Sequence, residues 1–108
     1  MTHAVFERKN GRFCGFTISG HAGEAASKRN SIACAAVSSA VQYATILITE
    51  SFCEQAEEKA EDGMTVITVR LMTPDQGHGS QILEGLYQHL KFVSEDYPGT
   101  MKIDILEV

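Results

Sequence analysis

The chain has 108 residues, 44% of them hydrophobic and 21% charged, and its formal net charge is −5. This length predicts one domain, residues 1–108, with one modest core. The negative charge argues against direct nucleic-acid binding, because phosphate contacts need clustered Lys and Arg. The first residues, MTHAVFERKNGRF, lack the apolar segment of a signal peptide, and no apolar run approaches the ~20 residues that a membrane span needs.

The N-terminal segment predicts a β-hairpin. Two β-rich runs in THAVFERKNGRFCGFTIS flank Asn10-Gly11, which is the strongest two-residue signal for a type I′ turn. In the second run, Cys14, Phe16 and Ile18 alternate, so we expect them on one face of the strand.

The next segment predicts a loop and then a long helix. Residues 20–30 contain two glycines and no apolar periodicity, which is typical of a loop. A helix is expected from about residue 31 to 55, because apolar residues recur there at helical spacing in two stripes. The stripes are Ile32, Ala36, Ala40, Tyr43 and Leu47, and Ala33, Val37, Val41, Ala44 and Ile48. Since both sides are largely apolar, we expect this helix to be buried in the domain or shared with a partner chain.

The second half of the chain predicts another strand and an amphipathic helix. The turn Asp62-Gly63 introduces the strand MTVITVRLM, and the charged stretch before it is expected to hold the end of an edge strand. After a loop over residues 74–79, Ser80 is the expected N-cap of a helix that ends before Pro98-Gly99. The apolar stripe of this helix is Ile82, Leu83, Leu86, Leu90 and Val93.

The expected order of elements is ββα(β)βαβ. The last strand is MKIDILEV, in which Met101, Ile103 and Ile105 alternate. This order is typical of an α+β domain in which a small mixed or antiparallel β-sheet carries two helices packed on one face.

The cysteines Cys14, Cys34 and Cys53 are widely spaced and contain no CxxC pair. This spacing argues against a zinc site or a redox motif, and we expect no metal and no cofactor. Thiols in a short chain without an export signal predict the reducing cytoplasm. Cys14 and Cys53 have no nearby His or helix start, so we interpret both as filler.

One stretch, SGHAGEAASKRNSIACAAVSSAV, suggests chemistry. If Asn30 or Ser31 caps the long helix, Cys34 falls in its first turn, where backbone N–H groups and the helix dipole favour a thiolate and an oxyanion. His21 lies across a loop long enough to fold back and form a thiolate–imidazolium pair. The residues alone leave a second interpretation open, because a Cys among alanines is often a small buried hydrophobe.

Two serines flank Cys34 on the expected helix. Ser38 follows it by one turn, and Ser31 precedes it by three residues, so both hydroxyls are candidates for hydrogen bonds near the sulfur. A serine inside a helix also often bonds back to a carbonyl four residues earlier. His78, in DQGHGS, is interpreted as part of a solvated loop, although a function in that loop stays open.

The pair SGHAG and CAAVSSAV, separated by this loop, resembles the signature of the ribosomal-processing cysteine protease family. The resemblance covers the order of elements along nearly the whole chain. It implies a homodimeric α/β cysteine endopeptidase that removes a short N-terminal extension from a large-subunit ribosomal protein, cutting after an aromatic residue. It also implies that His21 and Cys34 form the catalytic dyad and that Ser38 is the serine of the family motif. Gly20 and Gly23 are the two glycines of the predicted loop over residues 20–30, which also holds His21.

The sequence departs from the family pattern at Ser31. Family members usually have Asp three residues before the cysteine, as in DIVCA, whereas this chain has SIACA. Serine can cap a helix as well as aspartate, but it supplies no negative charge to hold an imidazolium. The loop also differs in length by a residue. We therefore expect weakened but retained dyad function, and a faster enzyme after Ser31→Asp.

Three hypotheses follow for the function. The first is a cytoplasmic cysteine endopeptidase that acts on a ribosomal protein precursor and forms a homodimer through the long helix or the strand edge beside it. The second is a divergent, non-catalytic, ribosome-associated binding module with the same fold, which the missing Asp favours. The third, a redox sensor that uses Cys34, lacks an obvious resolving cysteine.

Overall fold

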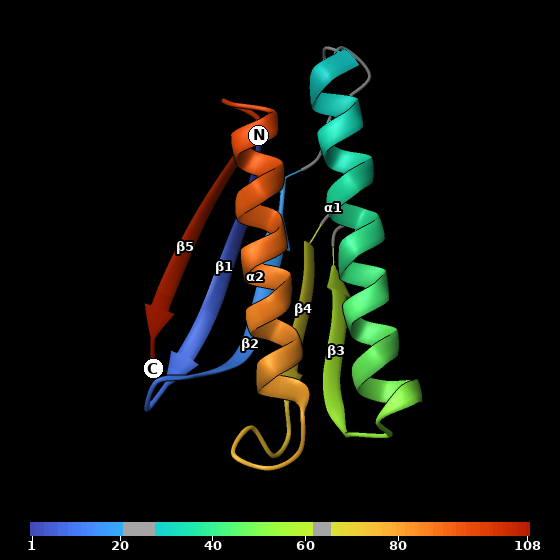
Figure 1. The fold of residues 1–108 in the computed structure, drawn as a ribbon, viewed down its shortest axis with the longest axis vertical. Helices are drawn as coiled ribbons and strands as arrows, with labels where there is room; N and C mark the ends of the chain where they lie inside the picture. Colours follow the sequence, from blue (N-terminus) through green and yellow to red (C-terminus); the bar gives the residue numbers. More distant parts are fainter. Residues whose placement is uncertain (21–27, 62–65) are drawn as a thin grey trace.

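A computed structural model describes residues 1–20, 28–61 and 66–108 (Figure 1). The strands are β1 (Thr2–Lys9), β2 (Arg12–Ser19), β3 (Ala56–Glu61), β4 (Val66–Leu71) and β5 (Met101–Glu107). The helices are α1 (Lys28–Ile46), which continues into a π-helical turn (Leu47–Ser51), and α2 (Gly79–Asp96). The strands form one sheet in the order β3-β4-β2-β1-β5, in which β5 runs parallel to β1 and the other neighbours are antiparallel. The predicted α+β class and element order are confirmed.

Both helices cover the same face of the sheet (Figure 1), and the core lies between them and the strands. The fully buried side chains with the largest volumes are Phe6, Phe16, Ile48, Leu83, Leu90 and Val69. The opposite face of the sheet is polar, with Thr17 beside Thr68 and an ion pair between Arg70 and Glu7 at 3.0 Å. Because one face of the sheet packs on the helices and the other faces water, apolar and polar residues alternate along the strands.

The hairpin forms as the sequence predicts, but one side-chain direction differs. Asn10 and Gly11 both have positive φ, 53° and 77°, as a type I′ turn requires. Near its start, β2 contains a β-bulge: Gly15 pairs with Glu7 and Phe13 pairs with Arg8, so Cys14 is the extra residue. The predicted alternation of Cys14 with Phe16 is therefore wrong, because the bulge turns Phe13 into the core instead.

Helix α1 begins and ends earlier than the sequence predicts. It already includes Lys28, so the predicted loop does not extend to residue 30, and the helical turns end at Ser51 rather than at residue 55. Its inner stripe, Ala33, Val37, Val41, Ala44 and Ile48, is buried against the sheet. On the other stripe, Ile32 is 42% exposed and Tyr43 67% exposed. The helix is thus a core helix with a partly exposed apolar side.

The segment Ser31–Ser51 is long and apolar enough to cross a membrane by length and composition, with a mean hydropathy of 1.6. The expectation that no apolar run approaches this length is therefore wrong. Length and apolar composition alone are weak evidence of a membrane span, because the core helix of a soluble protein can have both. Here one side of the segment packs on the sheet, which is the role of a core helix.

A carboxylate from the connection between the π-helical turn and β3 caps the start of α2. The Glu54 side chain accepts hydrogen bonds from the backbone N–H groups of His78, at 2.7 Å, and Gly79, at 3.1 Å. The predicted cap, Ser80, lies inside the helix, so that prediction is wrong. Glu54 satisfies donors at the helix N-terminus and places a negative charge where the helix dipole favours it. The predicted stripe of α2 is confirmed, with Ile82 at its half-buried margin.

The charged stretch before β4 forms β3, the edge strand that the sequence predicted. Its sequence is AEEKAE, and five of its six residues are exposed. Residues directly opposite each other in an antiparallel pair point to the same face. Glu58 lies opposite buried Val69 and therefore points toward the helices, whereas Glu57 lies opposite Arg70 and points away. Charged side chains on an edge strand also discourage pairing with other sheets.

Candidate active site

Cys34 lies inside α1, at a half-buried position on its N-terminal half. The sequence predicts it in the first turn, but α1 includes the six residues from Lys28 to Ala33 before it. Backbone N–H groups inside a helix are bonded to carbonyls four residues earlier, and the effect of the dipole falls off within the first turn. The prediction that a helix terminus stabilises the thiolate and an oxyanion at Cys34 is therefore wrong. A cation near the sulfur has to come from a side chain.

Ser31 and Ser38 are both exposed and lie on the same side of α1 as Cys34, one turn before and one turn after it. The structure thus places the three predicted residues on one flank of the helix. Ser31 does not cap α1, because the helix already includes Lys28. A polar group at position 31 therefore faces solvent beside the cysteine.

Gly20 directly follows β2 and precedes the predicted catalytic histidine. His21 and Gly23 lie outside the described residues, so the geometry of the predicted dyad stays a prediction. Gly20 has φ of +79°, and a Cβ at this position would collide with the backbone carbonyl oxygen of Met1. Only glycine accommodates both the left-handed backbone and this close approach. The chain therefore needs Gly20 to leave the sheet toward residue 21.

Gly20→Ala should destabilise the protein more than a glycine replacement that adds backbone strain alone. Gly99 is the matched control, because its φ is +80° and nothing lies within 4 Å of an added Cβ. We expect Gly99→Ala to lower the unfolding free energy by about 1 kcal/mol and Gly20→Ala by about 2 kcal/mol more. Urea unfolding of both variants measures the difference, and equal losses would contradict the role of the Met1 contact.

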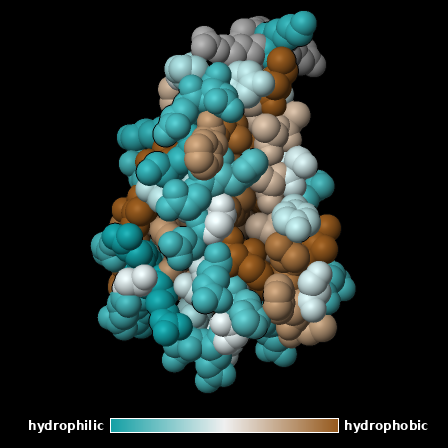
Figure 2. Space-filling view, in the orientation of Figure 1, coloured by the Kyte–Doolittle hydropathy of each residue, from teal (hydrophilic) through white to brown (hydrophobic). Residues whose placement is uncertain are grey.

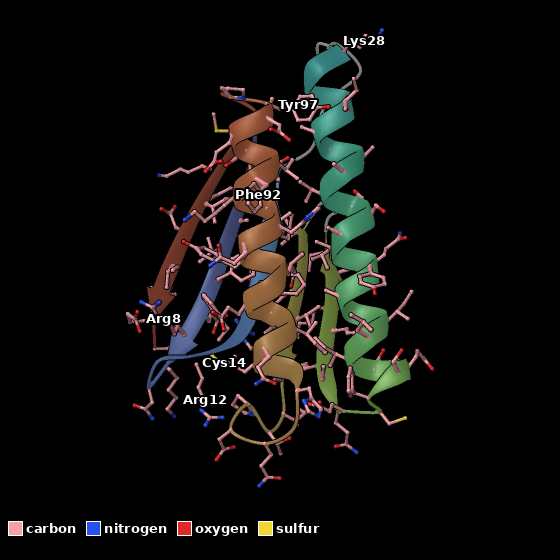
Figure 3. The ribbon with its side chains drawn as sticks, viewed as in Figure 1. Arg8, Arg12, Cys14, Lys28, Phe92 and Tyr97 are labelled. Carbon is pink, nitrogen blue, oxygen red and sulfur yellow. The ribbon has the colours of Figure 1, made fainter. Side chains whose placement is uncertain are left out.

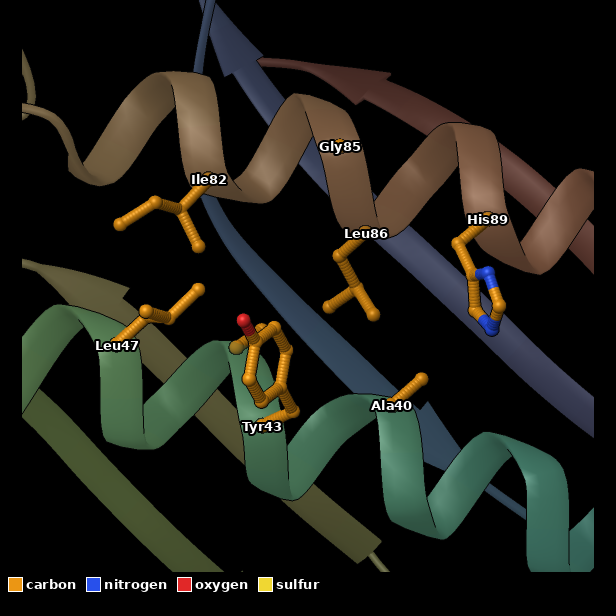
Figure 4. A pocket seen from close by; sticks show the side chains of 8 residues that line it. Ala40, Tyr43, Leu47, Ile82, Gly85, Leu86 and His89 are labelled. Atoms are coloured by element: carbon orange, nitrogen blue, oxygen red, sulfur yellow. The ribbon is translucent and has the colours of Figure 1, made fainter.

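The structure separates two grooves on opposite flanks of α1. The α1–α2 groove, about 420 Å³, is lined by Ala40, Tyr43, Ala44, Leu47, Ile82, Gly85, Leu86 and His89 (Figure 4). The α1–β3 groove, about 370 Å³, is lined by Val41, Gln42, Thr45, Ile46, Glu58, Lys59, Ala60, Ile67 and Val69. Val41 and Thr45 follow Cys34 by 7 and 11 residues, or about two and about three turns. Cys34 therefore lies on the same flank of α1 as the α1–β3 groove, whereas the α1–α2 groove lies on the opposite flank.

The other two cysteines lie apart from this flank. Cys14 sits at the end of the sheet opposite to Lys28 at the start of α1 (Figure 3), and its thiol donates to the Glu7 carbonyl at 3.4 Å. Burial raises the pKa of the Cys14 thiol, and the Glu7 carboxylate raises it further. Cys53 is exposed just after the π-helical turn, with φ of 53°.

Limited alkylation should distinguish the three cysteines. Because its pKa is raised, Cys14 forms thiolate only at higher pH and should react last. Cys53 serves as an exposed reference thiol. If His21 stabilises the Cys34 thiolate, iodoacetamide near neutral pH should modify Cys34 before Cys53, although Cys34 is half-buried. Peptide mapping by mass spectrometry gives the order, and labelling of Cys53 or Cys14 ahead of Cys34 would contradict an activated thiol.

His78 is the remaining candidate from the sequence, and His3 is a further histidine whose ring has a partner in the structure. His78 is exposed at the start of α2, where its ring lies 4.7 Å from that of Phe52, centroid to centroid. His3 bonds Asp104 at 2.8 Å. No group of three or more metal-ligating side chains occurs among residues 1–20, 28–61 and 66–108. The sequence analysis missed Glu54 and Glu58, whose roles depend on contacts with distant parts of the chain.

Comparisons with known structures agree with this fold. Prp from S. aureus, described as an essential ribosomal processing protease, is similar in complex with a substrate peptide, at 16% identity and a TM-score of 0.88, and with a covalently linked product peptide, at 17% identity and 0.85. Both alignments cover 98% of this chain and 100% of the other. SMU.848 from Streptococcus mutans is similar at 19% identity and a TM-score of 0.78, covering 100% of this chain and 96% of the other. At these identities the likeness establishes the fold.

The sequence itself carries the assignment to a family. No curated protein matches the chain. The model of the family described as cysteine protease Prp, however, matches residues 1–102, nearly the whole chain. That range includes Gly20, His21, Cys34 and Ser38, the positions that the sequence motif singles out. The chain belongs to the Prp cysteine protease family.

Proposed function

We propose that this protease removes a short N-terminal extension from a large-subunit ribosomal protein, using His21 and Cys34 as a catalytic dyad. The observation that carries the proposal is the family match over residues 1–102, with half-buried Cys34 on the flank of α1 that the α1–β3 groove also uses about two turns further on. The similar S. aureus protein is a ribosomal processing protease that holds a substrate peptide. Because the proposed substrate is the precursor of a ribosomal protein, we also propose that the enzyme is cytoplasmic.

In the proposed mechanism, the Cys34 thiolate attacks the carbonyl carbon of the scissile peptide bond. The protonated His21 imidazole then donates its proton to the leaving amine as the C–N bond breaks, which leaves a thioester on Cys34. The neutral His21 next takes a proton from water, which hydrolyses the thioester and releases the thiol. Since Cys34 lies beyond the first turn of α1, the imidazolium is the cation that favours its thiolate.

Ser31 bears on the rate of this reaction. The family usually has an aspartate at this position, and Ser31 lies exposed one turn before Cys34. A carboxylate there would favour a protonated His21 if it points at the imidazole, and it would disfavour the thiolate if it points at the sulfur. The family preference supports the first arrangement, so we expect Ser31→Asp to cleave faster than the natural chain.

The test is incubation of the protein with the organism's own ribosomal precursor peptide, read by mass spectrometry. Natural protein and Ser31→Asp should release one defined N-terminal fragment, and Cys34→Ala should release none. The cleavage rates of the natural protein and of Ser31→Asp are then compared from mildly acidic to mildly basic pH. Equal or lower rates for Ser31→Asp throughout would show that Ser31 is an adaptation. No cleavage by the natural protein, with Cys34 reduced, would favour a non-catalytic ribosome-associated binding module, which the absent carboxylate at Ser31 supports.

We also propose that the protein forms a homodimer through the apolar surface between its two helices. Figure 2 shows hydrophobic surface there, and Tyr43, Leu47, Ile82 and Leu86 line the α1–α2 groove from both helices (Figure 4). Tyr43, which lines this groove, is 67% exposed. Contiguous apolar surface of this kind often marks a protein interface, and this groove lies on the flank of α1 opposite to Cys34.

Light scattering at micromolar concentration should give about twice the chain mass of 11.8 kDa. Tyr43→Glu, which places a charge in the α1–α2 groove, should shift the mass toward one chain, because a buried unpaired charge is costly. Glu84→Gln, an exposed change on α2 outside this groove, is the control and should stay dimeric. A monomer across this concentration range for the natural protein would contradict the proposal.

A further inference from the structure

We propose that the α1–β3 groove binds a Lys or Arg side chain of the substrate, with Glu58 as its carboxylate partner. This assignment rests on the proposed function, because it takes Cys34 as the residue that marks the scissile bond. The groove has an apolar floor formed by α1 and β4, which includes Val41, Ile67 and Val69, and a rim on β3 that carries the Glu58 carboxylate. A long basic side chain fits both parts, since its methylene stem packs on apolar surface while its charged end reaches a polar partner.

Glu58 is the carboxylate that faces this groove. It lies opposite Val69 in the β3–β4 pair, so its side chain leaves the sheet on the helix side. Within residues 28–61 and 66–108, Glu58 makes no ion pair, whereas neighbouring Glu57 is 3.5 Å from the ammonium of Lys59. Lys59 also borders the groove, but its charge is compensated by that pair. The groove therefore presents a negative charge to an incoming cation.

The spacing along α1 places this groove within the reach of a peptide that is bound at Cys34. At 1.5 Å per helical residue, Val41 lies about 10 Å and Thr45 about 16 Å along the axis from Cys34. An extended peptide advances about 3.3 Å per residue. The basic side chain is therefore expected three to five residues from the scissile bond. The outer edge of β3 has backbone groups without a strand partner in the described sheet, which an extended peptide can use.

Peptide binding to the Cys34→Ala protein tests this inference without requiring cleavage. The probes are fluorescent precursor peptides in which one residue, three to five positions from the scissile bond on either side, is Lys, Gln or Glu. We expect one position at which Lys binds about 3- to 5-fold tighter than Gln, as an exposed ion pair allows. Glu58→Gln should remove the preference, and Glu58→Lys should reverse it in favour of Glu. Raising the salt to about 0.5 M should reduce both effects.

Glu84→Gln, which removes the same charge from α2, is the control and should keep the preference for Lys. The inference is overturned if no position prefers Lys, if Glu58→Gln keeps the preference, or if Glu84→Gln loses it equally. If a second copy of the chain occupies this groove instead, Glu58→Lys will lower the mass seen by light scattering and leave peptide binding unchanged, which also overturns the assignment. Loss of precursor cleavage by the natural protein would contradict the proposed function, whereas the binding measurements with Cys34→Ala would still decide the role of Glu58.

Discussion

His21→Ala should lower kcat/KM for the precursor peptide about 10³-fold, within the range of general acid–base catalysis. The large effect follows from where Cys34 lies. Because α1 already includes Lys28, the helix terminus gives little help to a thiolate at position 34. In the proposed dyad, the imidazolium of His21 has two tasks, which are to favour the thiolate and to protonate the leaving amine.

The pH dependence separates catalysis by His21 from a structural effect. In the natural protein, the rate should fall at alkaline pH as the imidazolium loses its proton, and this alkaline decrease should be absent in His21→Ala. His3→Ala is the matched control, since His3 lies on β1 and bonds Asp104 at 2.8 Å on the polar face of the sheet. Its activity should stay close to that of the natural protein. Near-normal activity of His21→Ala, or an equal loss in His3→Ala, would contradict the dyad.

Leu83→Ala should lower the unfolding free energy by about 2–5 kcal/mol, a large part of the stability of a small domain. Leu83 is fully buried on α2. One turn later on this helix, the ring of Tyr87 lies 5.4 Å from that of Phe6 and 5.3 Å from that of Phe13. Replacing the leucine removes apolar contacts and leaves a cavity that this packed aromatic cluster cannot easily fill.

Leu106→Ala is the matched control, because Leu106 lies near the end of β5 and is 53% exposed. We expect a change of about 0.5 kcal/mol or less for this substitution. Urea unfolding of the three proteins at one protein concentration gives the comparison, since association would otherwise shift apparent stability. Similar losses for both leucines would show that α2 does not supply the core.

Several elements could be predicted from the sequence because their signals are local. Asn10 and Gly11 adopt the positive φ values that few other residues tolerate, so the hairpin is encoded at its turn. The apolar period of α2 matches the stripe that packs on the sheet, and the alternation in β5 matches a half-buried face that packs against the core. The pair of motifs around His21 and Cys34 was likewise enough to predict the family, whose model matches residues 1–102.

Tertiary structure decided features that depend on distant contacts. The bulge at Cys14 arises in the pairing of β1 with β2, and it moves Phe13 into the core against the simple alternation. Ser80 looks like a cap in the sequence, yet Glu54, which precedes it by 26 residues, bonds the N–H groups at the start of α2. Lys28 and Arg29 are good helix formers, and α1 extends over them past the expected cap at Ser31.

The candidate site likewise has some features that could be predicted from the sequence and others that depend on distant contacts. The sequence by itself determined which residues are candidates for the chemistry, because His, Cys and Gly have properties that no neighbour has to supply. Only the structure decided the place of Cys34 inside α1, the flank that it shares with Val41 and Thr45, and the position of Glu58 on the groove further along that flank. The physical reason is that a groove and its charge are made by surfaces far apart along the chain, and these meet only when the sheet pairs and the helix packs on it.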